Sequence, residues 1–237
     1  MSKTARFLIP LAALLLACPA LAQTQYRFEF FAAATLPQDK HFEIGYPQSS
    51  IPMQGTHEWS PGARGGVRMG ADTWHHWGQD FVYSYGANST RIVNHYNGGA
   101  FGFTVHSHQF AYNLMWYPRF LDSKKKVNPY FSGGVGGAFY QLSQATINEA
   151  LDPNRAGLGK LRNEGIFTFN AGGGIRFRIN SVYGFRIDAR DYISNPPRFG
   201  LPESSTSPST VVFPVAGKFN QIEVSFGFVY YFKSARQ

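Results

Sequence analysis

The chain is almost without cysteine: Cys18 is the single one in 237 residues. Residues 23–237 therefore contain neither a structural disulfide nor a zinc site built on thiolates. Long apolar runs are missing as well, and none reaches the roughly 18 residues that a membrane-crossing helix requires. These absences exclude a disulfide-stapled domain and a helical membrane protein.

Charged residues are sparse too, at 15% of the chain, and 14 Asp and Glu against 22 Lys and Arg leave a net charge of +8. A basic balance can indicate nucleic-acid binding. Aromatic residues, in contrast, are abundant, with 22 Phe and 13 Tyr. Tyr suits a bilayer interface and Phe suits a lipid-facing strand, so the composition favours lipid as the surroundings.

The first 22 residues have the pattern of a secretory signal peptide. Lys3 and Arg6 precede an apolar run of eleven residues, and Ala20-Leu21-Ala22 is an A-x-A cleavage site. We predict cleavage after Ala22, which leaves residues 23–237 as one exported domain. The alternative is a lipoprotein acylated at Cys18. An exported chain meets anionic lipid and lipopolysaccharide, so we expect these as partners and no nucleic acid.

The clearest structural signal is strict alternation near the C-terminus, from Phe219 to Phe232. Large apolar residues share one face at period two, and small or polar residues share the other. The apolar set is Ile222, Val224, Phe226, Phe228, Tyr230 and Phe232; the opposite set is Gln221, Glu223, Ser225 and Gly227. Successive strand side chains point to opposite faces. Repeated behind a signal peptide, this pattern predicts a barrel with lipid outside and a polar interior.

Eight segments show such alternation, and the longer polar connections between them are residues 37–58, 89–100, 143–163 and 194–218. The segments are residues 25–36, 59–70, 80–88, 101–117, 130–142, 167–179, 183–190 and 219–232. Long extracellular loops that alternate with short periplasmic turns are typical of outer-membrane barrels. We predict an all-β fold, an eight-stranded antiparallel up-and-down transmembrane β-barrel with both chain ends on the periplasmic side.

Parity places a set of charged residues on the polar face, which would line the lumen. These are Arg27, Glu29, Arg64, Arg68, Asp80, Arg176, Arg178, Arg186, Asp188, Arg190 and Glu223. An eight-stranded barrel is just wide enough for side chains to fill, and buried charges must pair or be hydrated. We expect a salt-bridge network that plugs the lumen. The alternative is a narrow porin-like conduit, in which seven arginines against four acids would favour anions.

No motif predicts a cofactor, a metal site or catalysis. The glycine clusters at residues 133–137 and 172–174 lie inside strand patterns and do not match a phosphate loop. Ser107 lies between His106 and His108 but faces the other way on a strand. We therefore expect no catalytic residue, although a lipid-modifying enzyme around these three residues stays an alternative. A soluble lipocalin-like ligand-binding barrel, with the apolar face inside, is the alternative at the level of the fold.

Three runs and the terminal aromatic carry a family resemblance: residues 128–136 (NPYFSGGVG), 170–175 (NAGGGI), 185–190 (FRIDAR) and Phe232. Together they resemble the OmpA-like outer-membrane barrel family. The resemblance implies insertion by the barrel-insertion machinery, for which Phe226, Phe228, Tyr230 and Phe232 would form the lipid-facing terminal strand. It also implies a non-enzymatic role in envelope integrity or in contacts with an extracellular ligand through long loops. The chain has no segment resembling the peptidoglycan-binding domain of longer members.

Overall fold

The computed structural model describes residues 24–44, 53–73, 76–94, 99–118, 126–152, 158–206 and 211–232. The predicted signal peptide, its cleavage site and Cys18 lie outside these residues. The described chain forms ten strands and one helix. From the N-terminus onward these are β1 Thr24–Pro37, β2 Lys40–Ile44, β3 Met53–Trp59, β4 Gly62–Thr73, β5 Trp77–Asn94, β6 Ala100–Trp116, β7 Val127–Leu142, α2 Gln144–Leu151, β8 Glu164–Arg178, β9 Tyr183–Ser194 and β10 Phe219–Tyr231.

Eight of these strands close into a barrel. The pairing runs β5-β4-β1-β10-β9-β8-β7-β6, every pair is antiparallel, and β5 pairs with β6 to complete the ring. The register keeps the period-two pattern aligned across neighbours, so that Phe30 of β1 lies opposite Phe228 of β10 and Val67 of β4. The predicted eight-stranded antiparallel up-and-down barrel is confirmed.

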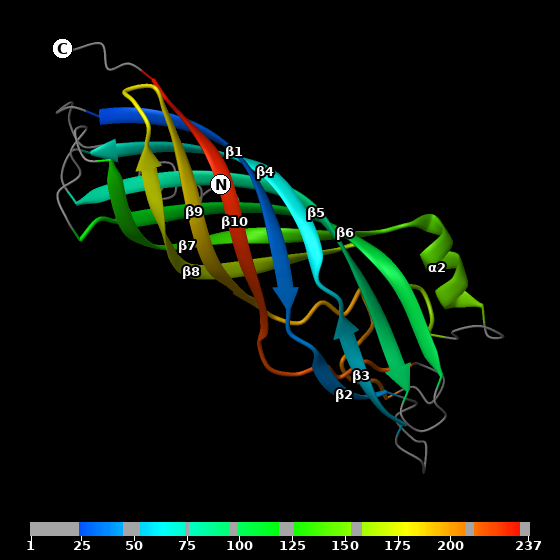
Figure 1. Cartoon of the computed structure of the whole chain (residues 1–237). Coiled ribbons are helices and arrows are strands. Elements are labelled where there is room, and N and C mark those ends of the chain that lie inside the picture. The colour runs from blue at the N-terminus through cyan, green and yellow to red at the C-terminus, as the bar shows by residue number, and fades with distance from the viewer. Residues whose placement is uncertain are drawn as a thin grey trace, which may run out of the picture.

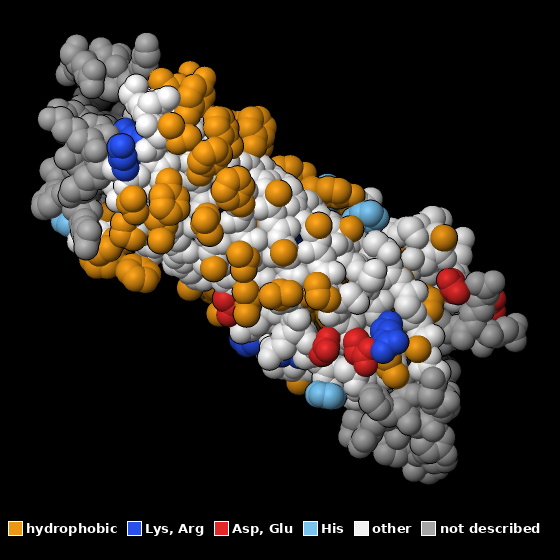
Figure 2. Space-filling model, in the orientation of Figure 1, with side chains coloured by type: hydrophobic (Ala, Val, Ile, Leu, Met, Phe, Trp, Pro, Cys, Tyr) orange, Lys and Arg blue, Asp and Glu red, His pale blue; other side chains and the backbone are white. Residues whose placement is uncertain are grey.

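The outer face of the barrel carries a belt of exposed apolar side chains. Phe30 and Phe131 are each about three-fifths exposed, at 62% and 61%. In Figure 2 most of the apolar side chains in view gather over the half of the barrel away from β2, β3 and α2, and most of the charged side chains in view lie toward β2, β3 and α2. The lipocalin-like alternative, with the apolar face inside, is therefore wrong: the apolar face points outward and the charges point inward.

The two ends of the barrel differ. β1 begins and β10 ends at one of them, which we call the terminal end, while β2, β3 and α2 lie at the other, which we call the cap end (Figure 1). β2 and β3 form a hairpin that takes up much of the predicted loop 37–58, and β3 pairs with residues 90–94 at the end of β5. The strand predicted at residues 80–88 was too short, because β5 continues to Asn94 and supports this hairpin.

The helix α2 follows β7 inside the predicted loop 143–163. Ser143 is its N-cap, and the Ser143 hydroxyl accepts a hydrogen bond from the backbone N–H of Thr146 at 3.1 Å. Such a cap satisfies one of the free donors at a helix start. Within the described part of the chain, no helix is both long and apolar enough to cross a membrane.

The interior of the cap end is apolar, which corrects the expectation of a polar lumen throughout. Trp59 lies with its ring 5.2 Å from that of Phe219, and Phe42 lies 4.5 Å from Phe213. We call this cluster the apolar cap; its buried members are Phe42, Trp59, Ile92, Phe103, Val105, Ala138, Tyr140, Leu142, Ala150, Leu158, Leu161, Phe199, Leu201, Phe213, Val215 and Phe219. The charged lumen therefore occupies only the remaining length of the barrel.

Candidate functional site

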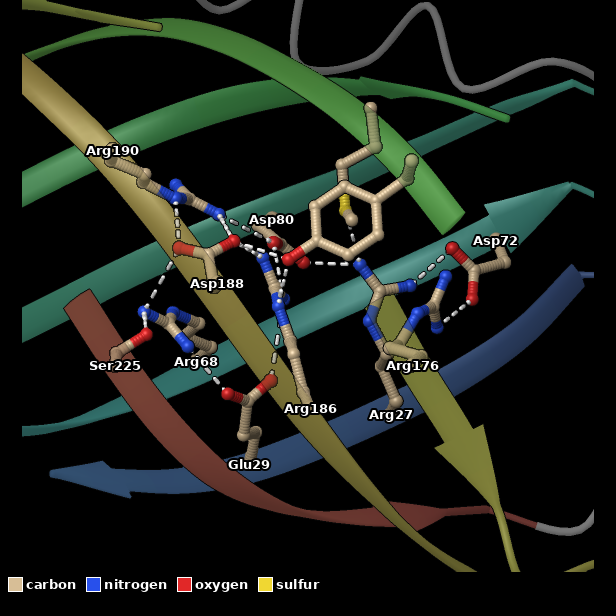
Figure 3. A network of polar contacts seen from close by, with 12 residues as sticks. Arg27, Glu29, Arg68, Asp72, Asp80, Arg176, Arg186, Asp188, Arg190 and Ser225 are labelled. Atoms are coloured by element: carbon tan, nitrogen blue, oxygen red, sulfur yellow. Dashed lines mark hydrogen bonds and ion pairs between the residues drawn. The ribbon is translucent and has the colours of Figure 1, made fainter. Parts of the chain in front are cut away.

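The charged residues of the barrel interior form the most elaborate polar cluster of the described chain (Figure 3). Ten of the eleven predicted lumen residues are buried, and Arg178 is partly buried and stacks on Tyr231 at 4.0 Å. The ten are Arg27, Glu29, Arg64, Arg68, Asp80, Arg176, Arg186, Asp188, Arg190 and Glu223. They come from β1, β4, β5, β8, β9 and β10, so that the sheet brings together residues far apart in the sequence.

Nearest the terminal end, Arg27 of β1 lies between two carboxylates. Its guanidinium forms ion pairs with Asp72 of β4 and Asp80 of β5. Asp72 also accepts from Nη1 of Arg176 at 2.6 Å and from the hydroxyl of Tyr117 at 2.8 Å. Each carboxylate is thus shared between donors, which compensates part of the cost of burying it.

Arg186 of β9 lies at the centre of the network. Its Nη1 is 2.9 Å from Oδ2 of Asp80 and 3.3 Å from Oε2 of Glu29, and its Nη2 is 3.0 Å from Oδ2 of Asp188. Its Nε donates to the hydroxyl of Tyr130 at 2.5 Å. The fixed fork of a guanidinium suits such simultaneous contacts, because its donors point in several set directions.

Two further arginines extend the network around Asp188. Nε of Arg190 donates to Oδ1 of Asp188 at 2.7 Å. Arg68 pairs with Oε1 of Glu29 at 2.5 Å, donates to the hydroxyl of Ser225 at 2.9 Å, and lies over the ring of Phe31 at 3.7 Å. The ion pairs are therefore continuous across the barrel rather than a set of separate bridges.

Arg64 forms the boundary between the charged and the uncharged interior. Its Nη1 is 3.2 Å from Oε2 of Glu223, and its Nη2 lies 3.1 Å from Oε1 of Gln221 and 3.3 Å from the hydroxyl of Ser107. It also donates to Gln109. From the terminal end to the cap end, the interior thus passes from ion pairs through uncharged polar groups to the apolar cap.

Asp72 is a member of the network that the sequence prediction missed. The second predicted strand ended at Gly70, so Asp72 fell in a turn, although it shares parity with Arg64 and Arg68. β4 runs to Thr73, and Asp72 is 1% exposed inside the barrel. The buried network therefore holds six arginines and five carboxylates, which is closer to balance than the predicted seven against four.

Inward-facing glycines create the room that these side chains occupy. A Cβ at Gly227 would lie 2.1 Å from Oε1 of Glu29, and one at Gly70 would lie 2.4 Å from Nη2 of Arg27. A side chain at either position would displace an ion pair. The glycines of the strands are thus part of the packing of the lumen, as strand glycines at close approaches commonly are.

Some buried donors in the lumen have no hydrogen-bond partner among the described residues. They include Nε and Nη2 of Arg176, Nη1 of Arg190 and the side-chain amides of Asn113 and Asn170. Buried polar atoms are normally satisfied, by ordered water where protein groups do not reach. The lumen therefore offers hydration positions beside the ion pairs.

The residues of the catalytic alternative lie on opposite faces of β6. Ser107 points into the barrel and is 2% exposed. His106 and His108 are partly exposed on the outer face, where Nδ1 of each lies within 3.0 Å of a tyrosine hydroxyl, that of Tyr85 and Tyr83 respectively. Across the described chain, no three His, Cys, Asp or Glu side chains gather so that they could hold a metal ion.

The predicted lipid-facing residues of β10 and the residue after it lie on the outer face. Phe226, Phe228, Tyr230 and Phe232 are between 38% and 54% exposed. Phe226 stacks on Phe185 of β9, with ring centroids 5.4 Å apart. The backbone N–H of Phe232 donates to the carbonyl oxygen of Tyr26 at 3.0 Å, which continues the pairing of β10 with β1 past Tyr231.

Comparison with known proteins identifies the architecture. No protein-family model matches the chain, and no curated protein matches it in sequence. Among solved structures, the outer membrane protein OprG from Pseudomonas aeruginosa is similar, with a TM-score of 0.61, 14% identity, and coverage of 90% of this chain and 98% of that one. Neisserial surface protein A gives a TM-score of 0.45 at 13% identity over 86% of this chain and 97% of that one. The chain thus has the fold of the small eight-stranded barrel represented by OprG.

Proposed function

We propose that the chain is a non-enzymatic outer-membrane barrel that presents a folded surface outside the cell, for envelope integrity or for contact with a partner. The membrane location is supported by the outward apolar belt over a charged interior, since lipid replaces water around such a surface. The cap end would face the exterior, as the long connections at that end favour. Lipopolysaccharide and the barrel-insertion machinery would be the general partners.

The observation that carries this proposal is the filled interior. The ion pairs that join Arg27, Asp80, Arg186 and Glu29 cross the lumen, and the apolar cap fills the opposite end. Because the ion pairs fill one part of the lumen and the apolar cap fills the other, the structure favours a scaffold over a channel for solutes. Binding residues are commonly presented by connections on a rigid scaffold, and here the β2–β3 hairpin and α2 extend from the cap end.

The display role is tested by shortening one connection at each end of the barrel. Residues 45–52, which join β2 to β3, are replaced by a short Gly-Ser segment; residues 119–125, which join β6 to β7 at the terminal end, receive the same change as the control. We expect the first variant alone to alter cell adhesion or the leakage of the envelope to a large antibiotic. If neither property changes in a correctly inserted variant, the display role is wrong.

A narrow anion conduit is the second candidate, and two observations favour it. The network has one more arginine than carboxylates, and Arg176 and Arg190 retain donors without a partner among the described residues. Recording from planar bilayers separates the two roles, because the scaffold is expected to be silent. Anion conductance that disappears in Arg176→Met and Arg186→Met would establish the conduit instead.

The absence of enzymatic activity is also part of the proposal. It is supported by the separation of Ser107 from both histidines by the sheet, since a nucleophile and its base must lie within hydrogen-bond reach. The test compares lipid A from cells that carry the wild-type chain or a His106→Ala/His108→Ala variant. A difference in lipid A structure between the two would contradict the proposal.

A further inference from the structure

A cavity of about 470 Å³ opens on the outer surface of the barrel, outside the lumen. It lies where β8 begins and β9 ends, next to the chain that follows β9. Its lining includes Arg162, Glu164, Phe167, Asn195, Pro196 and Arg198. None of these residues belongs to the lumen network, and the proposed display role does not use them.

The cavity lies at the edge of the apolar belt. Phe167 and Phe169 of β8 are 59% and 57% exposed and pack edge-to-face at 5.0 Å, and they face outward with the belt. The chain before them carries Arg162, and the chain after β9 carries Arg198. One side of the cavity is therefore apolar and aromatic, while the other is cationic.

Arg162 is held in place without an acidic partner among the described residues. Its backbone N–H donates to the carbonyl oxygen of Phe199 at 2.9 Å, and its Nη2 lies 3.5 Å from the carbonyl oxygen of Gly200. Gly200 has a φ of +83°, and a Cβ there would lie 2.2 Å from Nε of Arg162. Glycine is thus required for the guanidinium to lie across this turn, because any side chain would push it away.

The turn itself is fixed by Glu164 and by the apolar cap. Oε2 of Glu164 accepts the backbone N–H groups of Arg198 at 2.7 Å and Phe199 at 2.5 Å. Phe199 has a φ of +53°, which is unfavourable for a bulky residue, and its ring is buried in the apolar cap. Such strain persists only where the surroundings over-determine the backbone, and it is concentrated at functional sites.

The charges around the cavity favour an anion. Arg198 pairs with Glu203 at 2.9 Å, but both side chains are exposed enough for this pair to exchange with solvent. Nζ of Lys218 donates to Oδ1 of Asn195 at 3.3 Å, which brings a third cation to the rim. The cavity is thus surrounded by three cations, Arg162, Arg198 and Lys218, and by two carboxylates, Glu164 and Glu203. Oε2 of Glu164 already accepts two backbone hydrogen bonds, so the balance of charge is positive.

We propose that this cavity binds the phosphate-bearing headgroup of a lipopolysaccharide in the outer leaflet. Arg162 would hold the phosphate by two parallel hydrogen bonds, for which a guanidinium is well shaped. An acyl chain would lie along Phe167 and Phe169. The inference rests on the membrane location of the barrel, and it does not depend on the display role.

The experiment measures binding of fluorescently labelled lipopolysaccharide to the full-length protein in zwitterionic nanodiscs, by anisotropy. Arg162→Gln is the test variant, and Arg91→Gln is the matched control, because Arg91 is an exposed arginine of β5 paired with Glu58 at the cap end. We expect Arg162→Gln to weaken binding about tenfold or more, the usual scale for a hydrogen bond to a charged group, and Arg91→Gln to leave it unchanged. Equal affinity of Arg162→Gln and wild type would overturn the proposal.

Two further arms identify the ligand. Enzymatically dephosphorylated lipopolysaccharide is expected to bind the wild type about as weakly as intact lipopolysaccharide binds Arg162→Gln; undiminished binding would refute the role of phosphate. Inorganic phosphate at millimolar concentration is expected not to compete, and full competition would show a site for free phosphate instead.

Arg162→Lys, which keeps the charge but loses the fork, is expected to bind with intermediate affinity and to retain the mobility shift of a folded barrel. If Arg162→Gln loses both binding and the mobility shift while Arg162→Lys keeps the shift, the glutamine variant has not folded and the lysine variant decides. Wild-type affinity of Arg162→Lys would then overturn the bidentate contact.

Discussion

Arg186 and Asp80 join opposite walls of the barrel: Nη1 of Arg186 lies 2.9 Å from Oδ2 of Asp80, and β9 and β5 are four strands apart in the closed ring in either direction. Both side chains are 0% exposed. A single ion pair thus spans the full width of the lumen. Because Asp80 also contacts Arg27 and Arg190, its removal affects three cations at once.

Replacing Asp80 by Asn is expected to destabilise the barrel strongly. The change leaves buried guanidinium groups without their shared carboxylate, and breaking one partner of a buried pair costs about 3 to 5 kcal/mol. The free energy of unfolding is measured by urea titration in lipid vesicles, followed by tryptophan fluorescence. Glu58→Gln is the control, because it removes an exposed pair with Arg91 that is worth about 1 kcal/mol at most. Equal effects of the two substitutions would show that the lumen pairs are not structural.

Gly227→Ala is expected to destabilise the barrel although it adds only a methyl group. That methyl would overlap Oε1 of Glu29 and force it away from Arg68, and such overpacking costs about 1 to 3 kcal/mol. Gly65→Ala is the matched control on the outer face, where the nearest atom to an added Cβ is 3.8 Å away. Unfolding in urea should separate the variants, and a destabilised Gly65→Ala with a neutral Gly227→Ala would reverse the assignment of the two faces.

The stability of the apolar cap is expected to depend on pH through His57. This residue of β3 is fully buried, neither ring nitrogen has a hydrogen-bond partner among the described residues, and burial lowers its pKa to about 3 from 6.5. The folded cap holds His57 neutral, whereas an unfolded cap binds a proton below about pH 6.5. Stability is therefore complete above that pH and falls by about 1.4 kcal/mol for each pH unit below it, down to about pH 3.

Hydrogen exchange of β2 and β3 measures this dependence between pH 7 and pH 4, after correction for the intrinsic exchange rate. His57→Leu should abolish the fall in protection on the acidic side. His41→Leu, at an exposed position of β2, should retain it. Protection that is independent of pH in the wild type would show that burial does not lower the pKa of His57.

Phe213→Ala is expected to loosen the cap and to leave the barrel closed. Phe213 is 0% exposed and packs on Phe42 and His57, and truncation of a buried phenylalanine costs about 3 to 5 kcal/mol. Exchange should rise in β2 and β3, while the heat-dependent mobility shift on a denaturing gel persists. Loss of that shift would show that the cap and the barrel form one cooperative unit.

Period-two alternation made most of the barrel predictable, because each strand must present opposite chemistry to lipid and to the lumen. Arg186 and Phe226 could be assigned to faces from parity alone. Asp72 was missed because the segment at residues 70–73 has small and polar residues that resemble a turn. The apolar cap was missed for another reason. Trp59 was predicted only as the first residue of a strand, and Phe199 and Phe213 lie in the connection 194–218, where no period is visible and proline predicted irregular chain. His57 carries no sequence signal that distinguishes it from an exposed histidine.

The contrast between the two faces of the barrel also has an evolutionary consequence. An outward position has only to be apolar, so one large side chain can replace another there at little cost. An inward position such as that of Arg186 touches several charged partners, and a change there is tolerated only when those partners change with it. Substitutions in such a barrel should therefore be accepted singly on the outer face and only in matched groups on the inner face, so the strands can keep their arrangement while most outward residues change.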